Sequence, residues 1–65
     1  MSDIGKNIKK LREQRGISQD RLSKLADISS NTIAKLELGQ SPNPTIETLK
    51  KIAKALEVGV EVLLK

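Results

Sequence analysis

The segment DISSNTIAKLELG, residues 27–39, carries short polar side chains at a spacing that could read a nucleic acid. If residues 30–38 form a helix, which turns by about 100° per residue, Ile33 and Leu36 lie on one side of it. The opposite side carries Ser, Asn, Ala and Lys, which suit base edges in the DNA major groove, and the face is slim enough to enter that groove. The candidate base-contacting residues are Ser30, Asn31, Ala34 and Lys35.

The charges and the neighbouring helix start support this interpretation. Glu37, the one acid in this helix, falls beside Ile33, so the outward face carries no negative charge. Ser18 and Gln19 stand at the start of a preceding helix, where free N–H groups and the helix dipole attract phosphate. The alternative for Ser and Asn is that they only cap helices on a solvated surface.

Apolar periodicity predicts helices along the whole chain and no strand, so we expect an all-α fold and a single domain over residues 1–65. A first helix over about residues 3–15 ends at Gly16, and a second begins at Ser18. Ser29 or Ser30 caps the third, which follows after only about three residues, as in a helix-turn-helix unit. The expected inner faces are Leu22, Leu25 and Ala26 in the second helix and Ile46, Leu49, Ile52, Ala53 and Leu56 in a fourth, which Thr45 caps and Gly59 ends.

The composition excludes several classes of site. The 65 residues include no Cys and no His, which excludes thiolate metal sites, disulfides and the commonest general base. No Gly-rich phosphate loop has the required spacing. No apolar run approaches the roughly 20 residues of a membrane span, and the N-terminus lacks the apolar region of a signal peptide. We therefore expect no enzyme, metal, cofactor or membrane partner, and a cytoplasmic location.

The net charge of +4 is unevenly distributed, because residues 1–26 hold seven Lys and Arg against three Asp and Glu. A basic excess of this kind is compatible with a polyanionic partner such as DNA. The alternative is that a modest positive charge only aids solubility.

Three segments together resemble the Cro/CI-type (XRE-like) helix-turn-helix family of phage repressors and small bacterial transcriptional regulators. They are IGKNIKKLREQRGIS, SQDRLSKLADISSNTIAKLELG and NPTIETLKKIAKALEV, and they cover nearly the whole chain. Features at the spacing of this family include Arg12, Gln19, Leu22, Ala26, Ile33, Glu37, Gly39, Pro44, Leu49, Ile52, Ala53 and Leu56.

The resemblance implies a compact five-helix bundle, the lambda repressor-like DNA-binding domain, that acts as a homodimer on a two-fold operator in double-stranded DNA. By position, Ser30, Asn31, Ala34 and Lys35 would contact bases. The phosphate-contacting residues would be Arg12, Ser18, Gln19, Gln40, Ser41 and Asn43. Arg12 and Glu37 would form a structural ion pair, for which the alternative is an exposed pair of little energetic value. No small-molecule effector is expected, and the protein would be bacterial or phage-encoded and nucleoid-associated.

Two positions depart from the family pattern. Asp27 stands in the turn between the second and third helices, where the family usually has Gly, and Asp tolerates a left-handed backbone less easily than Gly. Leu38 stands where the family more often has a polar or basic residue, so it packs under the following loop or against a sugar.

The C-terminal segment VGVEVLLK carries more apolar residues than one short helix can bury. We expect a fifth helix over residues 60–64, with Leu63 in the core. Val60, Val62 and Leu64 would form the dimer interface. The alternative is a frayed terminus with scattered exposed aliphatic residues.

The main alternative function is a protein-interaction module, or an antitoxin-like protein that binds a partner, on the same fold. The acid-free outward face of the third helix favours DNA, whereas the scarcity of Arg on that face favours the alternative.

Overall fold

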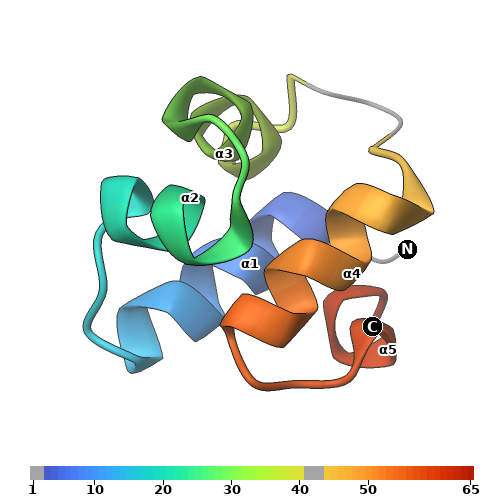
Figure 1. The fold of residues 1–65 in the computed structure, drawn as a ribbon. Coiled ribbons are helices and arrows are strands. Elements are labelled where there is room, and N and C mark those ends of the chain that lie inside the picture. Colours follow the sequence, from blue (N-terminus) through green and yellow to red (C-terminus); the bar gives the residue numbers. More distant parts are fainter. Residues whose placement is uncertain (1–2, 41–43) are drawn as a thin grey trace.

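The computed structural model describes residues 3–40 and 44–65, which form five helices and no strand. The helices are α1 (Ile4–Gln14), α2 (Gln19–Ala26), α3 (Ser30–Glu37), α4 (Ile46–Ala55) and α5 (Val60–Leu63). Helix α1 packs against both α3 and α5, which lie at opposite ends of the molecule (Figure 1). The predicted all-α bundle is confirmed. Within the described ranges, no helix is both long enough and apolar enough to cross a bilayer.

Side-chain caps begin the four longer helices. The side chains of Asp3, Ser18, Ser29 and Thr45 each accept a hydrogen bond from the backbone N–H three residues further on. Each cap satisfies one of the N–H groups that a helix start leaves without a partner. The predicted caps Ser18 and Thr45 are confirmed, and Ser29 rather than Ser30 caps α3.

Left-handed residues end the four longer helices. Gly16 follows α1 with φ +67° and Gly39 follows α3 with φ +74°, as the sequence predicts. Asp27 after α2 and Glu57 after α4 adopt the same conformation, with φ 57° and φ 59°. The prediction that Gly59 ends the fourth helix was wrong, because Glu57 already turns the chain left-handed and α4 ends at Ala55.

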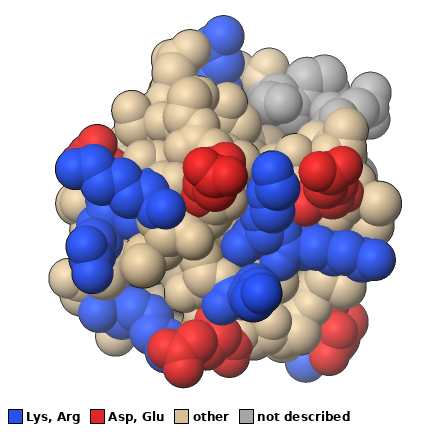
Figure 2. All heavy atoms as spheres, in the orientation of Figure 1, with Lys and Arg blue, Asp and Glu red and all other residues tan. Residues whose placement is uncertain are grey.

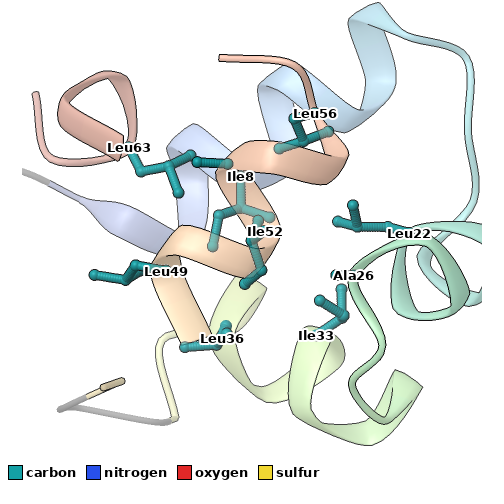
Figure 3. Close-up of a cluster of buried hydrophobic side chains, with 10 residues drawn as sticks. Ile8, Leu22, Ala26, Ile33, Leu36, Leu49, Ile52, Leu56 and Leu63 are labelled. Atoms are coloured by element: carbon teal, nitrogen blue, oxygen red, sulfur yellow. The ribbon is translucent and has the colours of Figure 1, made fainter. Parts of the chain in front are cut away.

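The core is aliphatic and draws on all five helices (Figure 3). Its fully or nearly fully buried members pack where the helices face one another. They are Ile8, Leu22, Ala26, Ile33, Leu36, Leu49, Ile52, Ala53, Leu56 and Leu63. Burying such side chains is the main source of stability in a chain with no aromatic residue and no disulfide.

Two residues expected on inner faces point to solvent instead. Leu25 is 49% exposed, and Ser23 is buried in α2 in its place. Leu25 and Ser23 flank Leu22 on opposite sides of the helix, and the core covers the Ser23 side. The Ser23 hydroxyl is satisfied there by donating to the Asp20 carbonyl oxygen at 2.6 Å. Ile46 is 57% exposed because it is the first residue of α4 and lies one turn before the buried stripe begins.

Gly5 allows α1 to approach α3 closely. A Cβ atom at this position would overlap the Leu36 carbonyl oxygen and would lie 3.2 Å from the Glu37 carbonyl oxygen. A side chain there would push α1 away from the C-terminal end of α3. Gly5 therefore sets the distance between these two helices, which the Arg12–Glu37 ion pair also joins.

Candidate nucleic-acid interface

Helices α2 and α3 are joined by three residues, Asp27, Ile28 and Ser29, which confirms the short joint predicted from the sequence. Asp27 turns the chain with φ 57° and ψ 46°. The Ile28 N–H then donates to the Ser23 carbonyl oxygen at 3.0 Å, and Ser29 caps the next helix. This sharp joint sets two helix starts at an angle, which is the geometry of a helix-turn-helix unit.

The outward face of α3 has the composition that the sequence indicates. Ser30, Asn31 and Lys35 are exposed and Ala34 is half-buried, while Ile33 and Leu36 are in the core. Figure 2 shows acidic side chains interspersed with Lys and Arg on this side of the molecule, and within α3 itself Glu37 is the one acid. The placement of the four candidate residues on one accessible face is confirmed, and their contacts with bases stay a prediction.

The one acid of α3, Glu37, faces inward and joins three helices. Arg12 of α1 donates from Nε to Glu37 Oε2 at 2.7 Å and from Nη2 to Glu37 Oε1 at 3.1 Å. Gln19 of α2 donates from Nε2 to the same Oε1 at 3.0 Å. The Arg12 side chain is 12% exposed and that of Glu37 is 3% exposed, so this is a buried pair and not a surface one.

The pair is satisfied on both sides. Arg12 Nη1 donates to the Ile17 carbonyl oxygen at 2.8 Å, so three of the five guanidinium N–H groups have protein acceptors. Burial opposes the charged form of Glu37, but hydrogen bonds from Arg12 and Gln19, together with the positive charge of Arg12, lower the pKa of Glu37 below its usual value. The hydrogen bond to Glu37 raises the pKa of Arg12, despite the burial of the guanidinium. Both groups are therefore charged at neutral pH.

This arrangement changes the roles expected of Arg12 and Gln19. Both were predicted to contact phosphates, and both direct their side chains at Glu37. Two guanidinium N–H groups and the second amide N–H of Gln19 are not used in these bonds. The Gln19–Glu37 bond was not predicted from the sequence, because it joins residues 18 positions apart and no local pattern encodes it.

The remaining phosphate candidates lie at the start of α2 and after α3. Ser18 is exposed and its side chain caps α2, as predicted, so its hydroxyl proton can still donate outward. Gln40 is exposed, while Ser41 and Asn43 lie outside the described residues. Leu38 is 71% exposed, and part of the loop under which it was expected to pack lies outside the described residues.

The residues predicted to form the dimer interface lie on α5 and just after it, far from α3 (Figure 1). Leu64 is 42% exposed, while Val60 and Val62 are half-buried, and Val60 packs against the core. Leu63 is fully buried, as predicted. In the part of the chain that the structure describes, no cluster of His, Cys, Asp and Glu could hold a metal ion.

Comparison with known proteins identifies the fold. A family model described as "Helix-turn-helix" (HTH_3) matches residues 8–63. The chain is 38% identical over 64 residues to the uncharacterized HTH-type transcriptional regulator RghRB of Bacillus subtilis, covering 98% of this chain and 46% of that protein. It is 33% identical to the HTH-type transcriptional regulator SinR of the same species, covering 94% of this chain and 55% of that protein. The chain thus spans about half the length of these relatives.

Solved structures agree. The crystal structure of SinR, the master regulator for biofilm formation, in complex with DNA matches with a TM-score of 0.92 at 32% identity, covering 95% of this chain and 98% of that one. The restriction-modification controller protein C.AhdI from Aeromonas hydrophila matches with a TM-score of 0.90 at 28% identity, covering 94% of this chain and 91% of that one. The resemblance inferred from the sequence is confirmed, and the chain belongs to the helix-turn-helix (HTH_3) family.

Proposed function

We propose that this protein is a transcriptional regulator that binds double-stranded DNA by inserting α3 into the major groove. The observation that carries the proposal is the inward orientation of Glu37, which removes the only negative charge of α3 from its outward face. Ser30, Asn31, Ala34 and Lys35 remain on that face as base-reading groups. The likeness to SinR, which was solved in complex with DNA, supports the same assignment.

The phosphate contacts would come mainly from the start of α2. Backbone N–H groups at a helix N-terminus bind phosphate without reading sequence, and the Ser18 hydroxyl lies beside them. Gln19 and Arg12 would add their unused N–H groups while they hold Glu37. The basic excess of residues 1–26 would strengthen this contact and make it sensitive to salt.

The protein would act as a homodimer that joins two copies through Val62 and Leu64, with Val60 behind them. Two recognition helices about 34 Å apart would then enter successive major grooves of a two-fold operator. Binding of this kind represses transcription where the operator overlaps a promoter. The proposed place of action is the bacterial nucleoid.

Selection from a pool of random DNA duplexes, with sequencing of the bound fraction at several salt concentrations, tests the proposal. We expect an inverted repeat with half-sites about one helical turn apart. Asn31→Ala should relax the preference at one base position in each half-site, at a cost of about 1–3 kcal/mol. Gln14→Ala, an exposed change on α1, is the control and should leave the preferred sequence unchanged.

Two results would contradict the proposal in different ways. Salt-sensitive binding without an enriched sequence would leave only backbone contacts and remove the base-reading roles. Absence of binding even at low salt would instead favour a protein-interaction module on this fold.

A further inference from the structure

Helix α5 is too short to be stable without contacts to the rest of the protein. It spans four residues, Val60–Leu63, and Gly59 at its start gives it no side-chain cap. Isolated helices shorter than about 12–15 residues are marginal in water, so a single turn forms only where other parts of the protein hold it. Only Leu63 of α5 is fully buried. Leu63 and the half-buried Val60 pack α5 against the core, but this apolar packing does not satisfy the carbonyl groups at the end of α5.

A single amide on α1 adds polar restraints at this end of the helix. Asn7 Nδ2 donates to the Leu63 carbonyl oxygen and to the Lys65 carbonyl oxygen, each at 2.9 Å. Both N–H groups of the amide are used. The Leu63 carbonyl is one of those that a helix end leaves without a partner, and Lys65 follows that end by two residues. Two bonds from one planar group therefore tie α1 to the end of α5 and to the residue just beyond its cap.

The sequence carries a signal for this role. Asn7 lies three residues after Ile4 and four before Leu11, and so on the apolar side of α1, where a polar residue needs a specific partner. The amide stands beside a hollow of about 300 Å³ between α1 and the chain end, lined by Asn7, Lys10, Leu11, Gln14, Val62 and Lys65. Asn7 is half-buried there, so its bond to Leu63 is partly shielded from water, whereas its bond to Lys65 is exposed.

We infer that Asn7 is a positioning residue that orients the α5 surface for contact with a second copy of this chain. The inference rests on the proposed dimeric function. Arg12, on the same helix, holds α3 through Glu37, so α1 connects the recognition helix to the proposed interface. Asn7 therefore helps to set the spacing between the two recognition helices of a dimer. Its loss should weaken binding to a complete operator more than binding to a half-site.

Asn7→Asp in the full chain tests the inference. The carboxylate has the shape of the amide but faces the two carbonyl oxygens with acceptors instead of donors. Gln14→Glu is the matched control, because it makes the same amide-to-carboxylate change on the same helix, beside the same hollow. Asn7→Ala is the second variant, which removes the bonds without adding charge and is used if Asn7→Asp fails to fold by circular dichroism.

Three measurements compare Asn7→Asp with Gln14→Glu. Hydrogen exchange of the amides in residues 60–65 should accelerate in Asn7→Asp and not in Gln14→Glu. Sedimentation with interference optics, needed because the chain has no Trp or Tyr, should show a dimer weakened by about tenfold. Affinity for the full operator should fall by a similar factor, while affinity for a half-site changes little.

The inference about Asn7 would be overturned if Asn7→Asp and Gln14→Glu had the same exchange rates, dimer stability and operator affinity. The proposed function would not be affected by that result. Equal losses on the operator and the half-site would reduce Asn7 to a residue of general stability and overturn the positioning role. The proposed function is tested instead with the unaltered chain. If that chain shows no sequence-selective binding, the DNA-reading role is overturned. If it is a monomer both free and on DNA, the dimer and the positioning role of Asn7 are overturned together.

Discussion

The α2–α3 unit and α5 are held in very different ways. Side chains cap both helices of the unit, the joint between them is three residues long, and Glu37 receives three hydrogen bonds from the other helices. Helix α5 has no side-chain cap and is held by the buried Leu63, by Val60 packed against the core and by the Asn7 amide. The surface proposed to read DNA is therefore rigidly supported, whereas the surface proposed for association depends on few contacts.

Because different contacts hold them, the two surfaces can be altered separately, although both are attached to α1. Helix α1 contributes Arg12 to the first and Asn7 to the second. Substitutions at Glu37 should affect the whole fold, because its network links three helices. Substitutions around α5 should affect association first.

Replacement of Glu37 by Ala should give the largest effect. It leaves the mostly buried charge of Arg12 without its partner, and breaking a buried pair in this way costs about 3–5 kcal/mol. A domain of this size has a free energy of unfolding of roughly 3–10 kcal/mol, so the variant should be partly or wholly unfolded at 37 °C. Urea denaturation followed by circular dichroism measures the change.

Glu57→Ala is the matched control for this prediction. Its carboxylate also pairs with an arginine, Arg15, at 3.2 Å, but the Glu57 side chain is 77% exposed. Exposed pairs contribute little, so the loss should be much smaller than for Glu37→Ala. Equal losses in the two variants would show that the Glu37 network does not support the α2–α3 unit.

Acid should weaken the contribution of the Glu37 network to the stability of the fold. Because the folded protein lowers the pKa of Glu37, the unfolded chain takes up the proton first as the pH falls. The contribution of Glu37 to stability is therefore complete above its unfolded pKa, about 4.3, and is lost as the pH falls through the lower folded pKa. Glu37→Gln, which cannot titrate, is the comparison. Its stability deficit in urea should be constant above pH 5 and narrow towards pH 3, and a deficit that does not change with pH would contradict the prediction.

The sequence predicted features that depend on local pattern and on family resemblance. Helix order, the caps Ser18 and Thr45 and the Arg12–Glu37 pair all belong to this class. Leu25 and Ile46 were placed wrongly, because periodicity gives the direction of an apolar stripe but not which neighbours cover its edges. The end of α4 was misplaced because Gly59 is the obvious stop signal, whereas Glu57 is not.

The interactions that the sequence did not reveal join residues far apart in the chain. The Gln19–Glu37 bond, the approach of Gly5 to Leu36 and the Asn7 bonds to the end of α5 all depend on how helices pack. The first and the last are the polar supports of the two surfaces compared above. Thus the sequence identified which faces are candidates for function, and only the structure shows what holds them.

The smallest effect should come from the joint inside the α2–α3 unit. Asp27 adopts φ 57° and ψ 46°, a conformation that costs most L-residues about 1–2 kcal/mol and Gly nothing. Gly in turn makes the unfolded chain more flexible, which offsets about 0.4–1 kcal/mol of the gain. Asp27→Gly should therefore stabilise the fold by about 0.5 kcal/mol and raise the melting temperature slightly. A lower melting temperature would mean that the Asp27 side chain contributes to the joint, and that the α2–α3 unit has a further polar support that its hydrogen bonds do not reveal.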